Sequence, residues 1–63
     1  MSYWTIQSAK YAENYRVVIR DESDNILVDE EITTIGGKRD AERQALNLTS
    51  YSGTMYMNTK RIK

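Results

Sequence analysis

Hydrophobic side chains alternate with polar ones through three stretches in the first half of the chain. Such alternation places every second residue on one face and predicts half-buried strands. The predicted strands are Tyr3–Ser8, Tyr15–Arg20 and Ile26–Ile32. Asp21–Asn25, between the second and the third strand, is rich in the short polar side chains that form tight turns. We therefore expect the three strands to form an antiparallel meander.

One face of this meander is expected to turn inward. It carries mainly aliphatic side chains, and its predicted members are Trp4, Ile6, Tyr15, Val17, Ile19, Ile26, Val28 and Ile32. In the third strand the same alternation directs Leu27, Asp29 and Glu31 outward. It also places Glu30 on the inward face. Because a buried carboxylate needs a partner, we expect Glu30 near the end of the sheet or beside a cation.

The stretch Lys38–Leu48 has the composition and spacing of an amphipathic helix. Its apolar stripe, at positions i, i+4 and i+7, consists of Ala41, Ala45 and Leu48. Two alanines make this stripe thin, so the helix can lie close to the sheet. We expect Thr33 or Thr34 as the N-cap. Gly53 is expected at the C′ position, where a left-handed backbone favours glycine.

A last strand is predicted for Thr54–Ile62. Neither of its two faces is cleanly apolar, so the pattern leaves open which of them points to the core. We expect this strand to join an edge of the sheet or to pair with the first strand. The sequence thus predicts an α+β fold, a small antiparallel sheet in the order β-β-β-α-β with one amphipathic helix packed on one face.

Composition limits the chemistry of this chain. Its 63 residues are enough for one domain, expected to span residues 1–63, and such a domain buries only about 60% of its unfolded surface. The sequence has no histidine and no cysteine, which removes the commonest general base and the thiolate nucleophile. No apolar run approaches the roughly 20 residues that span a bilayer. We therefore expect a cytoplasmic protein that is not an enzyme, with no catalytic residues, no cofactor and no membrane association.

A calcium loop is the nearest approach to a metal motif. Asp21, Ser23 and Asn25 match its first three ligand positions. However, Ile26 stands where the loop needs glycine, and Ile32 stands where it needs the closing glutamate. We therefore predict no metal site.

Charge is balanced overall but unevenly distributed. The net charge is zero, and six acidic residues fall between positions 21 and 31. The candidate acidic patch consists of Asp21, Glu22, Asp24, Asp29 and Glu31. These carboxylates can keep a turn and an edge strand exposed to water, or they can imitate the phosphates of a nucleic acid.

Five tyrosines and one tryptophan are more rings than a core of this size can hold. We therefore expect several of them at the surface, although Tyr15, Tyr51 and Tyr56 can also line the rim of the core. Tyrosine and arginine are typical anchors of protein interfaces. The candidate contact residues are Tyr3, Arg16, Arg20, Lys38, Arg39, Arg43, Lys60 and Arg61.

The segment DAERQALNLTSYSGTMYMN resembles a pattern in small phage-encoded proteins, including anti-CRISPR proteins of type I-F systems. The matching residues are Thr34, Ala41, Ala45, Gly53 and Thr54. This sequence departs from the pattern at Gly36-Gly37, which lengthens the entry to the helix, and at Asn58, where an apolar residue is expected. The resemblance implies a small inhibitor that binds a host nucleoprotein complex in the host cytoplasm.

Three hypotheses follow for function. The first is a phage-type protein that binds and inhibits a host protein or nucleoprotein complex, most concretely a CRISPR surveillance complex. The second is a small DNA- or RNA-binding module that uses the sheet face and the basic start of the helix. Its pI near 6.2 argues against this role. The third is a protein that assembles with copies of itself.

Overall fold

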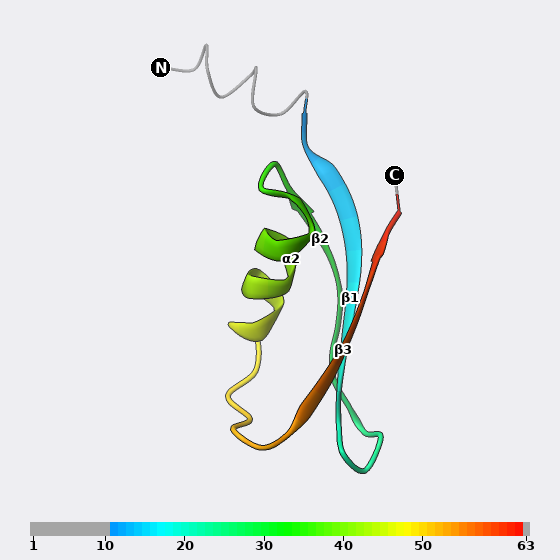
Figure 1. Ribbon diagram of the computed structural model, residues 1–63, viewed down its shortest axis with the longest axis vertical. Helices are drawn as coiled ribbons and strands as arrows, with labels where there is room; N and C mark the ends of the chain where they lie inside the picture. The colour runs from blue at the N-terminus through cyan, green and yellow to red at the C-terminus, as the bar shows by residue number, and fades with distance from the viewer. Residues whose placement is uncertain (1–10, 63) are drawn as a thin grey trace.

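The computed structural model of the chain describes residues 11–62, which form a sheet with one helix against it (Figure 1). The elements are β1 (Glu13–Asp21), β2 (Ile26–Thr34), α2 (Gly37–Leu46) and β3 (Met55–Arg61). The sheet is antiparallel with the strand order β2-β1-β3. The predicted α+β fold is confirmed, and the described elements follow the order β-β-α-β. The strand predicted at Tyr3–Ser8, with Trp4 and Ile6, lies outside the described residues.

The turn between β1 and β2 is held by one carboxylate. Asp21 Oδ1 accepts hydrogen bonds of 2.9 Å from the backbone N–H groups of Ser23 and Asn25. Asp24 has a φ of 69°, the left-handed conformation that aspartate tolerates in turns. The acidic stretch therefore forms a tight turn, as its composition predicted.

A β-bulge in β2 overturns part of the predicted alternation. Val28 is opposite Ile19 but Ile26 is opposite Arg20, so Leu27 has no partner of its own on β1. One extra residue exchanges the faces of the residues beyond it. Ile26, expected inward, is therefore 54% exposed, and Leu27, expected outward, packs partly against the core.

The core lies between α2 and the sheet. Its buried apolar residues are Tyr15, Val17, Ile19, Val28, Ile32, Ala41 and Ala45. Ala41 and Ala45 are completely buried, as expected for a helix that lies close to the sheet on its alanine stripe. Glu30 does not follow either expectation. It is opposite Val17 in the middle of β2, and it is exposed because β2 is an outer strand.

The start of α2 differs from the predicted cap. Gly36 is the N-cap residue and no side chain caps the helix. The Thr34 hydroxyl instead accepts a hydrogen bond from the Gly36 N–H and donates one to the Asp40 carboxylate. The chain can turn from strand into helix because Gly37 has a φ of +83°, which glycine adopts without strain.

The helix also ends earlier than predicted. Its last residue is Leu46, and the N–H of Asn47 closes the final turn on the Gln44 carbonyl. Asparagine and β-branched threonine are poor helix formers, and they occur just where the helix stops. Consequently Gly53 is not the C′ residue, and Leu48 is 59% exposed instead of lying on the buried stripe.

The last strand, β3, lies at an edge of the described sheet and pairs with β1. The structure shows which of its two faces points to the core. Met55, Met57 and Thr59 turn toward the helix, and the Thr59 hydroxyl donates a 2.7 Å hydrogen bond to Glu42 Oε2. The intervening side chains of β3 point to the other face of the sheet.

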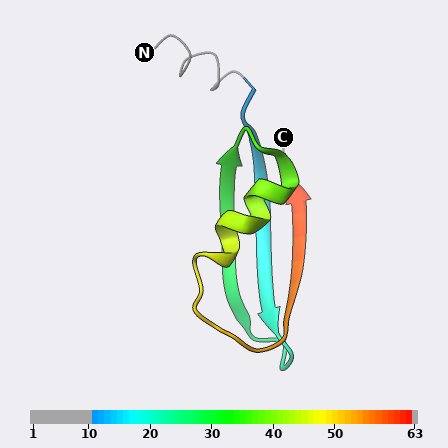
Figure 2. The same cartoon turned by 60° about the vertical axis from the view of Figure 1, so that its left-hand side comes forward.

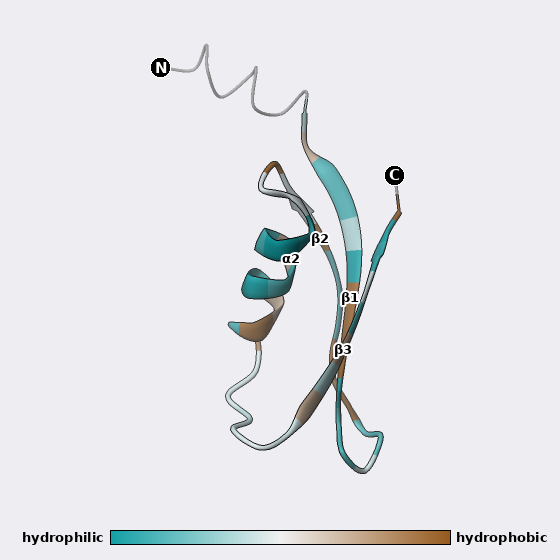
Figure 3. Cartoon of the chain, in the orientation of Figure 1, coloured by the Kyte–Doolittle hydropathy of each residue, from teal (hydrophilic) through white to brown (hydrophobic). Residues whose placement is uncertain are grey.

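The helix divides the sheet into a covered face and an uncovered one. In Figure 2, α2 lies in front of the sheet and β3 to the right of β2, so the connection β2-α2-β3 is right-handed, as is usual. Figure 3 shows the apolar part of β1 in brown and the first turns of α2 in teal.

Among the described residues, no helix has both the length and the apolarity needed to cross a membrane.

Candidate functional site

The candidate site is the face of the sheet opposite α2, called here the open face. Its side chains form three rows across β2, β1 and β3. The rows are Glu31–Arg16–Lys60, Asp29–Val18–Asn58 and Ile26–Arg20–Tyr56. The rows bring residues from both halves of the chain together, because β1 is the central strand and contributes the middle member of each row.

A shallow depression of about 250 Å³ lies in this face. It is lined by Arg16, Val18, Arg20, Asn58 and Lys60. The short Val18 side chain lies between the longer side chains of Arg16 and Arg20 on the same strand, which accounts for the hollow. The depression thus combines an apolar floor with three cationic side chains and one amide.

One of these cations is already paired. Arg16 donates two parallel hydrogen bonds of 2.9 Å, from Nε and Nη2, to the two carboxylate oxygens of Asp29. These bonds lower the pKa of Asp29 below its usual value and raise the pKa of Arg16. Both side chains are partly exposed, so the pair mainly orders the guanidinium and contributes little to folding.

The other two cations are more available to a partner. Arg20 Nη1 lies 3.8 Å from Asp24 Oδ1, and that aspartate is 83% exposed. Lys60 has no ion pair with any side chain of residues 11–62. Arg20 and Lys60 are therefore the positive groups of the open face that a partner can engage with the least loss of existing contacts.

Among the three rows of the open face, the third carries the large exposed apolar side chains. Tyr56 is 60% exposed and Ile26 is 54% exposed, and Arg20 lies between them. A tyrosine and an arginine side by side supply a rigid ring and a fork of five donors, a combination typical of interface anchors. This row therefore brings an aromatic, a cationic and an aliphatic side chain together on the open face.

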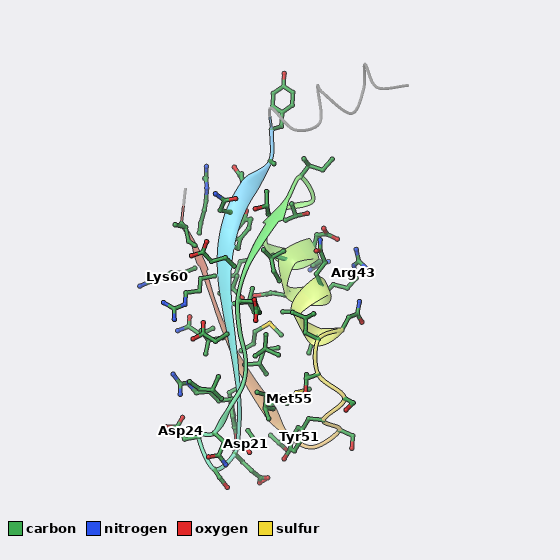
Figure 4. All side chains as sticks on the ribbon, turned by 180° about the vertical axis from the view of Figure 1, so that it is seen from behind. Asp21, Asp24, Arg43, Tyr51, Met55 and Lys60 are labelled. Carbon is green, nitrogen blue, oxygen red and sulfur yellow. The ribbon has the colours of Figure 1, made fainter. Side chains whose placement is uncertain are left out.

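The structure divides the predicted contact residues between the two faces. Lys38, Arg39 and Arg43 belong to α2, on the opposite side of the sheet from Arg16, Arg20 and Lys60. Figure 4 shows Arg43 and Lys60 pointing away from each other. Arg61 pairs with Glu13 at 2.9 Å beside the helix-side residue Tyr15. Tyr3 lies outside the described residues.

The predicted acidic patch is divided as well. Asp21, Glu22 and Asp24 belong to the turn after β1, whereas Asp29 and Glu31 lie on the open face. Backbone hydrogen bonding from Asn25 lowers the pKa of Asp21, which is therefore engaged in holding the turn. Only two of the five carboxylates thus contribute to the candidate site.

Three members of these rows were not predicted as contact residues from the sequence: Ile26, Tyr56 and Asn58. The position of Tyr56 and Asn58 on the open face follows from the period-two pattern of β3, because Met55 and Met57 face the helix. Ile26 gives no such signal, because the bulge that turns it outward has no mark in the sequence. Of the tyrosines expected at the core rim, Tyr15 is buried and Tyr56 is exposed.

Within residues 11–62, no group of three or more acidic side chains comes together in a way that could hold a metal ion. Searches of protein-family models, curated proteins and solved structures found no match to this chain. The fold and the open face together define a small α+β domain with a mixed-charge, partly aromatic surface.

Proposed function

We propose that this protein acts by binding, and that it docks the open face of its sheet onto a protein or nucleoprotein complex of its host and inhibits it. The observation that supports this proposal is the row of Ile26, Arg20 and Tyr56, which exposes apolar and aromatic surface around an arginine. The sequence resemblance to small phage inhibitors makes a CRISPR surveillance complex in the host cytoplasm the most concrete target.

The charges of the open face favour a protein surface over bare nucleic acid. Three cations share this face with Asp29 and Glu31, and Arg16 is already held by Asp29. A row of phosphates on a duplex would gain from Arg20 and Lys60 but would be repelled by the two carboxylates of β2. A protein surface that itself carries both signs can match this arrangement.

A capture experiment with matched variants tests the proposal. The tagged protein is incubated with host lysate, and retained proteins are identified by mass spectrometry. We expect a specific partner that is lost with Arg20→Glu and with Tyr56→Ala. Arg39→Glu, which makes the same charge change on α2, should retain it. Equal retention by all variants, or loss with Arg39→Glu alone, would contradict the role of the open face.

Inhibition is tested separately on the captured partner. We expect the purified protein to reduce the partner's activity in proportion to its occupancy, and Tyr56→Ala to be weaker in both binding and inhibition. Binding without any loss of the partner's activity would support docking through the open face but contradict the inhibitory role.

A nucleic-acid-binding role is the second candidate. It is favoured by Arg16, Arg20 and Lys60, which meet around the depression. It predicts affinity for bare duplex or single strands at about 50 mM salt that falls steeply as salt is raised. Lys60→Glu should abolish this affinity while Lys38→Glu, on the other side of the molecule, should leave it unchanged. No binding at low salt would exclude this role.

A further inference from the structure

The outer edge of β3 has no neighbouring strand among the described residues. The N–H of Ile62 donates a 2.8 Å hydrogen bond to the carbonyl of Asn14 on the β1 side. Because backbone groups of a strand alternate in direction, Tyr56, Asn58 and Lys60 also direct theirs to β1. The N–H and C=O groups of the intervening residues, Met55, Met57, Thr59 and Arg61, therefore point outward and are open to a further strand.

The outer edge of β2 is much less suited to pairing with its own copy. An antiparallel copy placed around Glu30 would set Glu30 against Glu30 and Asp29 against Glu31. Like charges directly opposite each other destabilise a sheet. The bulge at Leu27 interrupts the same edge, and bulges and charged side chains are two ways by which proteins protect sheet edges.

The edge of β3, in contrast, is complementary to itself. Antiparallel pairing around Asn58 places Tyr56 opposite Lys60 of the second copy and Met57 opposite Thr59. Met55 then lies opposite Arg61. No like charges face each other, and the Tyr56 ring can contact the Lys60 side chain and its ammonium group. All seven residues of β3 are paired in this register, and outward-pointing backbone groups meet each other throughout.

The position of the helix leaves apolar surface beside this edge. α2 lies mainly over β2 and β1 and least over β3, so Met55 and Met57 remain only half-buried. In the same register, Thr59 and the aliphatic stem of Arg61 from the second copy would lie beside these two methionines. The second copy thus covers surface that the helix does not reach.

We propose that the protein forms a symmetric dimer by antiparallel pairing of β3 with β3 of a second copy, around a two-fold axis at Asn58. The dimer has one continuous sheet that joins the three described strands of each copy, with both helices on the same side. The two open faces become one surface with two depressions. This inference goes beyond the proposed function and is tested on the purified protein alone.

The first test measures mass in solution. Multi-angle light scattering of the wild type should give twice the chain mass of 7.3 kDa as concentration rises. Asn58→Asp places two carboxylates opposite each other at the axis and should give the mass of one chain. Within its own chain, the new carboxylate lies among Arg16, Arg20 and Lys60, so the fold should tolerate it. Asn58→Thr, which is neutral, should remain dimeric.

The second test uses the lack of native cysteine. Opposite residues in a non-hydrogen-bonded pair have Cα atoms about 4.5 Å apart, within the range that a disulfide bridges. Asn58→Cys should therefore form a covalent dimer under mild oxidation, whereas Glu31→Cys on the outer edge of β2 should not. A wild type that stays at 7.3 kDa at all concentrations, an Asn58→Asp variant that stays dimeric, or equal crosslinking of both cysteines would overturn the proposal.

Discussion

The β-bulge in β2 makes two isoleucines of one strand energetically different. The alternation of the sequence treats Ile26 and Ile32 as equivalent core residues, but Ile32 is 8% exposed and Ile26 is 54% exposed. Truncation to alanine removes three carbon atoms, worth about 2.4 kcal/mol when fully buried. Both variants lose the same β-propensity. The difference between them therefore measures burial.

The expected magnitudes follow from these exposures. Ile32→Ala should lose about 2.2 kcal/mol of transfer free energy plus a cavity term, giving about 3 kcal/mol in all. Ile26→Ala should lose only about 1 kcal/mol, because half of its side chain is in water and no enclosed cavity is left. For a domain of this size, the difference of about 2 kcal/mol corresponds to about 8–16 °C in Tm.

Thermal and urea unfolding followed by circular dichroism measure both losses. The total stability of a 63-residue domain is about 3–9 kcal/mol, so Ile26→Ala should give a readable transition throughout this range, and Ile32→Ala should give one if the wild type exceeds about 4 kcal/mol and should be largely unfolded otherwise. An unchanged urea m-value would show that the same surface is exposed on unfolding in each protein. Equal losses of stability, or a larger loss for Ile26→Ala, would refute the bulge and restore the simple alternation.

Three further perturbations probe the helix and its start. Hydrogen bonds from Thr34, Arg43 and Gln44 lower the pKa of Asp40 from 3.8 to about 2, so its contribution to stability is complete above about pH 4 and is lost as pH falls through 2. Asp40→Asn should therefore show a smaller fall in Tm than the wild type between pH 4 and pH 2; an equal fall would contradict this role. Ala45→Leu forces a larger side chain between helix and sheet and should cost about 1–3 kcal/mol in urea unfolding, whereas no loss would mean that the helix does not lie close. Gly37→Ala should cost about 1 kcal/mol from backbone strain alone, because the added Cβ meets nothing within 4 Å beyond its chain neighbours and the backbone of its own helix, and a neutral result would argue against the left-handed conformation.

Periodicity in the sequence was sufficient to predict the sheet, the helix and most of the core. Val17, Ile19, Val28, Ile32 and the alanine stripe of α2 follow directly from spacings of two and four residues. These residues are predictable because burial of one face is the dominant constraint on a strand or helix. The composition of the turn after β1 likewise predicted its structure.

The predictions that were wrong concern features that depend on interactions which local spacing does not encode. The bulge at Leu27 shifts Ile26 outward, and the early end of α2 leaves Gly53 in a loop rather than at a C′ position. The candidate site was harder still. Its cations could be chosen from the sequence, but their separation onto two faces depends on which side of the sheet the helix covers.

The topology also has a consequence for the order in which the domain assembles. β1 lies between β2 and β3 in space but precedes both along the chain. Its hairpin with β2 is local and can close within microseconds, whereas its other side waits for residues 55–61 to be synthesised. A nascent chain that pauses before that point has α2 to cover Val17 and Ile19, but the backbone groups of β1 that face β3 are unpaired and the sheet under the helix is only two strands wide. We therefore expect translation through the β3 codons to be the step at which the domain becomes resistant to proteolysis.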